Sequence, residues 1–196
     1  MTPNYAILTN CDTIKKRLKS ESNNYIIVKF KDTVNYTSGF INDKCNSRNG
    51  ISYIIYLDSI IGNFKEQEGN KGSDKINAPL IIEANNSIEI YFSEPISNLK
   101  NFFNDEFDDN SKNIIYIDLS HFNSSLVNNT SKMFYNCPNL EYLDLSNFNP
   151  IKLSENDYIF DNLNSIKYIN LNNLVNENLI SQIKILNLNE KNNLIV

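Results

Sequence analysis

Hydrophobic residues in the C-terminal half of the chain recur at fixed intervals. The segment NIIYIDLSHFN begins at Asn113, NLEYLDLSNFN at Asn139 and SIKYINLNNLV at Ser165, so the pattern starts again twice after 26 residues. In each copy, one apolar residue is followed three and five positions later by two more. This spacing is typical of a short strand that points alternate side chains inward. The pattern therefore predicts a repeat in which each copy contributes one strand.

Each copy also predicts its buried positions. The inward residues of the three strands are Ile114, Ile117 and Leu119, then Leu140, Leu143 and Leu145, then Ile166, Ile169 and Leu171, followed by Phe122, Phe148 and Leu174 as a mainly aromatic spine. Between two strands, Met133 and Phe134 precede Pro138, which predicts one short helical turn with Cys137 buried beneath it. One such unit buries too little apolar surface to offset its chain entropy, so the units must stack.

Irregular versions of the pattern flank the three copies. Upstream, the segment from Ser87 to Phe103 predicts a preceding unit, with inward residues Ile88, Ile90 and Phe92 and a helical part at Leu99, Phe102 and Phe103. Downstream, the segment from Asn176 to Ile183 predicts a short helix, and the strand pattern returns at Ile183. Terminal repeats are commonly atypical, so this end is interpreted as an irregular cap.

The first 86 residues have a different character. Segments 24–31, 50–61 and 78–84 are rich in Ile, Val and Tyr and predict β-strands, and residues 13–19 predict a short helix. The predicted domains are therefore 1–86, an N-terminal β-rich cap region, and 87–196, a leucine-rich repeat solenoid with an irregular C-terminal cap. The predicted fold class is α+β and β-rich, a short leucine-rich repeat solenoid of about 26-residue coils with that N-terminal cap.

Charge and hydropathy exclude several functions. The net charge of −5 and the pI of about 4.9 argue against nucleic-acid binding, which needs a basic face. No run of 18 apolar residues exists, so we expect no membrane insertion. The first twenty residues contain no apolar core of a signal peptide, which leaves open a cytoplasmic protein or a leader that was removed.

Candidate chemistry is sparse. Cys11, Cys45 and Cys137 form no metal-ligand pattern; the first two either pair in an oxidising compartment or are separate thiols. The single His121 occupies the repeat position of Asn147, and no Gly-x-Ser-x-Gly, phosphate-binding loop, HExxH or CxxC segment is present. We therefore predict no enzymatic activity and no cofactor.

Outward positions of the repeated strands form three columns. Strands lie about 4.8 Å apart, so equivalent residues line up across them. The columns are Tyr116, Tyr142 and Tyr168; Asp118, Asp144 and Asn170; and Ser120, Ser146 and Asn172. We interpret them as a partner-binding strip, because Tyr offers a rigid amphipathic surface. Alternatively, the stacked rings only stabilise the strands. Asp118 and Asp144 would repel each other unless hydroxyls and water solvate them or a cation such as calcium lies between them.

The repeated segments, above all IDLSHFNSSLVNNTSKMFYNC and LEYLDLSNFN, resemble the BspA-like leucine-rich repeat surface proteins of bacteria and microbial eukaryotes. The resemblance covers about residues 87–175. It implies a repeat used for surface display, adhesion or protein binding at the cell surface or in secreted form, without enzyme activity.

Residues and resemblance together predict a non-enzymatic protein-binding or adhesion module whose partner is a host or neighbouring-cell protein. Two alternatives stay open: an intracellular scaffold or effector that uses the same repeats, and a passive repeat that spaces whatever the N-terminal region binds.

Overall fold

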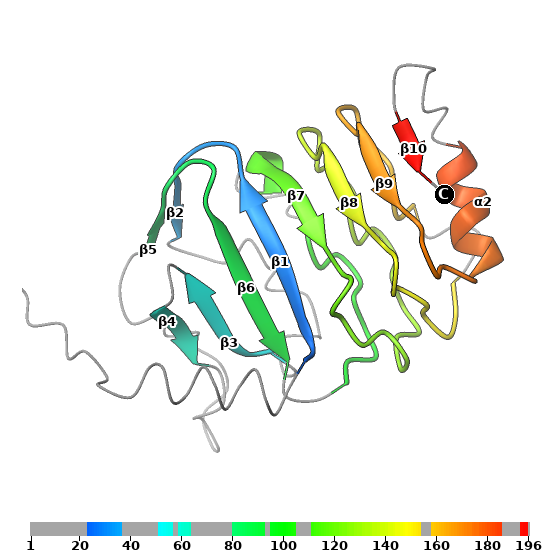
Figure 1. Ribbon diagram of the computed structural model, residues 1–196, viewed down its shortest axis with the longest axis horizontal. Coiled ribbons are helices and arrows are strands. Elements are labelled where there is room, and N and C mark those ends of the chain that lie inside the picture. Colours follow the sequence, from blue (N-terminus) through cyan, green and yellow to red (C-terminus); the bar gives the residue numbers. More distant parts are fainter. Residues whose placement is uncertain are drawn as a thin grey trace, which may run out of the picture.

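The structure, a computed structural model, describes residues 23–36, 51–56, 59–63, 80–92, 95–104, 111–153, 158–185 and 193–195. The predicted helix at 13–19 and the pairing of Cys11 with Cys45 lie outside these residues. Within them the chain forms an open mixed sheet, a separate pair of strands and one α-helix (Figure 1).

The strands are β1 (Tyr25–Phe30), β2 (Val34–Tyr36), β3 (Ile51–Tyr56), β4 (Ser59–Asn63), β5 (Leu80–Ile82), β6 (Ser87–Phe92), β7 (Ile114–Asp118), β8 (Tyr142–Asp144), β9 (Tyr168–Asn170) and β10 (Asn193–Ile195). The helix α2 (Glu177–Ile185) lies at the β9–β10 end of the sheet, and a 3₁₀ turn at Ser111–Asn113 precedes β7. The main sheet has the order β10-β9-β8-β7-β1-β6-β3-β4, while β2 pairs only with β5.

Strand β1 lies in the middle of the main sheet, antiparallel to both β6 and β7. Its residues alternate between the two faces, and Ile26, Val28 and Phe30 are fully buried. Val28 lies opposite Ile88 on one neighbour and Ile117 on the other, so apolar side chains of three strands meet on the same inner face. The strand predicted within 24–31 is confirmed, and the segment predicted at 50–61 contains two antiparallel strands, β3 and β4.

The predicted fold class is wrong. A leucine-rich repeat solenoid requires a row of equivalent parallel strands, each followed by its own helical segment. Here β7, β8, β9 and β10 are parallel, but the same sheet continues with β1, which is antiparallel to β7, and with further antiparallel strands beyond it. Helix α2 is the one α-helix among the described residues. Hydrophobic spacing is a local signal, and it does not say that β1 would pair with strands about 60 and 90 positions away.

The 26-residue offset nevertheless predicts the strand register. Tyr116 pairs with Tyr142, and Tyr142 with Tyr168, in parallel strands. Two local predictions fail. Met133 and Phe134 lie in a hydrogen-bonded turn that is not helical, and the strand expected to begin at Ile183 is helical at that residue, because α2 extends to Ile185. Strand β10 takes the place beside β9.

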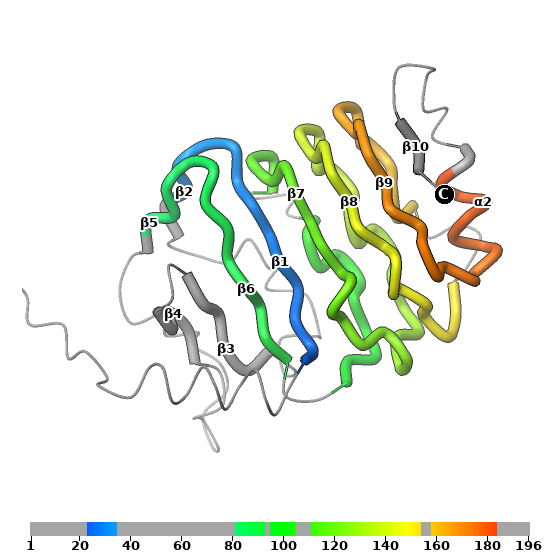
Figure 2. Tube along the Cα trace, in the orientation of Figure 1, coloured from blue at the N-terminus to red at the C-terminus, as the bar shows by residue number. Residues whose placement is uncertain are grey.

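Figure 2 shows chain segments that return behind β7, β8 and β9. The buried residues of the core come from the sheet strands and from these segments. These segments hydrogen-bond to one another: the backbone N–H of Phe103 donates to the carbonyl oxygen of Met133, and that of Phe134 donates to Ile159. Phe103, Phe134 and Phe160 form a stack of rings, with centroids 5.7 and 5.8 Å apart and interplanar angles of 10° and 11°. The buried residues predicted for the three repeats lie in this core.

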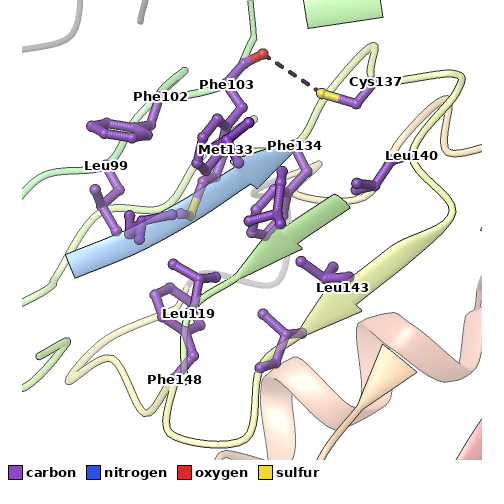
Figure 3. Packing of buried hydrophobic residues seen from close by; sticks show 14 of the residues in the cluster. Leu99, Phe102, Phe103, Leu119, Met133, Phe134, Cys137, Leu140, Leu143 and Phe148 are labelled. Atoms are coloured by element: carbon purple, nitrogen blue, oxygen red, sulfur yellow. Dashed lines mark hydrogen bonds between the residues drawn. The ribbon is translucent and has the colours of Figure 1, made fainter. Parts of the chain in front are cut away.

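Cys137 is buried as predicted (Figure 3). Its thiol donates a hydrogen bond to the carbonyl oxygen of Phe103 at 3.6 Å. Burial raises the pKa of this thiol to about 12, so it stays protonated at neutral pH and behaves as a small core residue.

Asparagine has a structural role in the turns. Seven described non-glycine residues have positive φ, and five of them are Asn85, Asn101, Asn136, Asn162 and Asn173. Asparagine tolerates this left-handed conformation better than most residues, because its short side chain can hydrogen-bond locally. A chain with few glycines therefore uses asparagine where it reverses direction.

Candidate functional site

The outer face of the sheet, opposite the core, carries the predicted strip together with side chains of β1 and β6. Strand alternation sends to this face the side chains of Tyr25, Ile27 and Lys29 from β1, Glu89 and Tyr91 from β6, Tyr116 and Asp118 from β7, Tyr142 and Asp144 from β8, and Tyr168 and Asn170 from β9. We call this set the tyrosine face. Its neighbours in the strands, such as Val28 and Ile117, are fully buried in the core.

Three tyrosines of the tyrosine face form a ladder. The ring centroids of Tyr116 and Tyr142 are 4.4 Å apart at an interplanar angle of 8°, and those of Tyr142 and Tyr168 are 4.7 Å apart at 7°. All three side chains are partly exposed. Because each ring covers a face of the neighbouring ring, the ladder presents ring edges and hydroxyl groups to solvent. The sequence predicted this column correctly.

The column beside the ladder closes the turns that follow the strands. The Oδ1 atoms of Asp118, Asp144 and Asn170 each accept a hydrogen bond from the backbone N–H two residues later, at 2.8, 2.9 and 3.1 Å. Such side-chain contacts to the backbone stabilise tight turns. The predicted column is thus part of the fold.

Tyrosine hydroxyls donate hydrogen bonds to the second oxygen of each carboxylate. The hydroxyl of Tyr116 donates to Oδ2 of Asp118 at 3.2 Å, and that of Tyr142 donates to Oδ2 of Asp144 at 3.3 Å. Asp144 also accepts a hydrogen bond from Nδ2 of Asn170 at 2.8 Å. Each carboxylate thus accepts a hydrogen bond from a tyrosine hydroxyl, which is one of the ways considered above to lower the repulsion between them.

The two carboxylates differ in accessibility. Asp144 is only 6% exposed, whereas Asp118 is partly exposed. In the serine column, Ser146 is also buried, Ser120 is partly exposed and Asn172 is exposed. The accessible part of the predicted strip therefore consists of the tyrosine ladder, Asp118, Asn170 and the ends of the serine column.

Strands β1 and β6 extend the tyrosine face beyond the predicted strip. The ring of Tyr25 stacks on Tyr91 at 5.1 Å and on His121 at 4.5 Å. The hydroxyl of Tyr91 donates to Oε2 of Glu89 at 2.7 Å, which repeats the contact of Tyr116 with Asp118. The sequence contained a signal for this pair: Glu89 and Tyr91 have the same spacing of two as Tyr116 and Asp118, in reversed order.

Burial raises the pKa of three tyrosine hydroxyls on this face. Desolvation is the largest cause that raises the pKa of Tyr91 and Tyr116, and the adjacent Glu89 and Asp118 raise it further. The same causes, with Asp144 as the adjacent carboxylate, raise the pKa of Tyr142 to about 12. At neutral pH each hydroxyl is protonated and donates a hydrogen bond to a carboxylate. The oxygens of Tyr116 and Tyr142, which are partly exposed, can still accept a hydrogen bond from outside, whereas Tyr91 is only 1% exposed.

The described ranges offer neither a cluster of metal ligands nor a membrane-spanning helix. They contain no group of three or more His, Cys, Asp or Glu side chains placed to hold a metal ion. No helix among the described residues is long and apolar enough to cross a membrane.

Comparison of the chain with models of protein families, with curated proteins and with solved structures found no match. The resemblance to BspA-like proteins therefore stays a prediction from the sequence.

Proposed function

We propose that the protein is a non-enzymatic binding module that engages a protein partner through the tyrosine face. The observation that carries the proposal is the ladder of Tyr116, Tyr142 and Tyr168, which is partly exposed although its rings are in contact. Tyrosine is enriched in protein interfaces because it brings a large rigid surface and a hydrogen-bonding group at low entropic cost.

The form of the surface favours a protein over a small ligand. The ladder rings cover one another's faces, so a sugar or a heterocycle has few ring faces on which to stack. What remains is a row of ring edges and oxygen atoms along neighbouring strands, which complements another extended surface better than a compact ligand.

Site-specific photocrosslinking tests this proposal. A benzophenone amino acid would replace Lys29 or Asn172, which border the ladder, or Tyr158, which is 56% exposed and lies outside the sheet strands. In living source cells, we expect positions 29 and 172 to yield one adduct of defined mass and position 158 to yield none. The partner, identified by mass spectrometry and purified, is expected to bind the unmodified chain in calorimetry.

A matched variant provides the control. Tyr116→Ser with Tyr142→Ser removes the ring edges and is expected to abolish the adduct from position 172, while circular dichroism confirms that the variant is folded. An adduct that forms equally from position 158, or that survives in the double variant, would reject the tyrosine face as the binding surface.

A further inference from the structure

The middle of the tyrosine face presents hydrogen-bond acceptors. Ile27 on β1 lies opposite Glu89 on β6 and Asp118 on β7, so the two carboxylates flank one apolar side chain, with roughly 10 Å between their strands. At one end of this row Glu89 accepts a hydrogen bond from the hydroxyl of Tyr91, and at the other end Asp118 accepts one from the hydroxyl of Tyr116. We call Glu89, Ile27 and Asp118 the acceptor row.

The charge of the acceptor row is uncompensated in the part of the chain that the structure describes, where neither Glu89 nor Asp118 forms an ion pair. Lys29 lies opposite Tyr116, one row away, and Lys167, just before β9, pairs with Glu141 at 2.8 Å. Burial raises the pKa of Tyr25, and Glu89 and Asp118 both add to this shift, so both carboxylates act on the same region of the face.

We propose that the acceptor row binds an arginine side chain presented by the protein partner. This inference rests on the proposed function and names the chemistry of the partner. The row offers the partly exposed carboxylates of Glu89 and Asp118 beside the phenol oxygen of Tyr116, and these oxygens need donors. A guanidinium group has five N–H donors in one plane.

Arginine fits the row better than lysine does. The guanidinium group is more weakly hydrated than an ammonium group and packs well on aromatic and apolar surfaces. Ile27 supplies the apolar surface, and Tyr25, stacked between Tyr91 and His121, presents its ring edge beside it. The ammonium group of a lysine is more strongly hydrated, so it would lose more hydration free energy on contact with the same apolar side chain.

The first experiment uses a synthetic probe. The peptide acetyl-Thr-Arg-Thr-Arg-Thr-Arg-Thr-amide would be titrated into the ¹⁵N-labelled full chain at low salt. We expect chemical-shift changes concentrated in β1, β6 and β7. Peptides with citrulline or lysine in place of arginine are expected to bind at least about fivefold more weakly, because they lose the charge or the planar donors.

Conservative variants then locate the contact. Glu89→Gln with Asp118→Asn removes both charges and keeps the acceptors for Tyr91 and for the turn after β7; Asn170 already shows that Asn can hold this turn. We expect at least a tenfold loss of affinity for the arginine peptide, no change in Glu177→Gln on α2, and two- to threefold tighter binding in Lys29→Gln, which removes a repelling charge.

Three outcomes would overturn the inference: equal affinity for the arginine and lysine peptides, unchanged affinity in the double variant, or no shifts in these strands up to millimolar peptide. The proposed function is judged separately. If the crosslinked partner binds the tyrosine face and the double variant binds it as tightly as the unmodified chain, the arginine inference fails while the proposed function stands.

Discussion

Phe134→Ala is expected to lower the free energy of unfolding by about 3–5 kcal/mol. Phe134 is fully buried, and its ring is in stacking contact with Phe103 on one side and Phe160 on the other. Alanine would leave a cavity between two rings that belong to different turns, and the backbone hydrogen bonds between these turns restrict collapse around it. Urea denaturation followed by circular dichroism measures the change.

Leu126→Ala is the matched control. Leu126 is 49% exposed and follows β7 in the same part of the chain, so its truncation is expected to cost less than about 1 kcal/mol. Equal losses for the two variants would contradict the stacked core, since they would mean that Phe134 is no better packed than a surface residue.

Asp144→Ala is expected to lower the free energy of unfolding by about 2–4 kcal/mol. The carboxylate accepts hydrogen bonds from the backbone N–H of Ser146, the hydroxyl of Tyr142 and the amide of Asn170, and Asp144 is 6% exposed. Alanine would leave these donors without their acceptor in a site that water barely reaches. Such unpaired buried groups cost more than the net value of the bonds they had formed.

Two variants separate this effect from that of charge. Asp118→Ala removes a partly exposed carboxylate that accepts two hydrogen bonds. It is expected to lower the free energy of unfolding by about 1 kcal/mol, because water can take the place of the carboxylate. Asp144→Asn keeps Oδ1 for Ser146 and is expected to fall between the two alanine variants. A larger loss at Asp118 than at Asp144 would contradict the described burial of the two carboxylates.

The sequence predicted strands and registers better than it predicted their neighbours. The pairing of Tyr116 with Tyr142 and Tyr168 follows from the repeat, because equal offsets place equivalent residues on adjacent strands. The position of β1 does not follow in this way. Ile26 and Val28 alternate with residues of the tyrosine face, as in any half-buried strand. That alternation is the same whether the strand lies at the edge or in the middle of a sheet. Pairing between distant segments is decided by packing of the whole sheet.

The candidate site was predicted in part for the same reason. Asp118 and Asp144 occupy identical places in the repeat, so the same role was predicted for both. In the structure, the amide of Asn170 and the neighbouring strand bury Asp144, while Asp118 lies beside β1 and stays partly exposed. Glu89 and Tyr25 join the face only because β1 lies between β6 and β7, which no local pattern indicates.

Hydroxyl-radical footprinting of the tyrosines, with and without the purified crosslinked partner, tests the binding role of the tyrosine face most directly. Tyr158 is 56% exposed, lies outside the sheet strands and is the internal reference. We expect the partner to slow oxidation of Tyr116, Tyr142 and Tyr168 at least about threefold and to leave Tyr158 unchanged, because a bound interface excludes water from its centre. Unchanged oxidation of the three ladder tyrosines at saturating partner would contradict a binding role for this face.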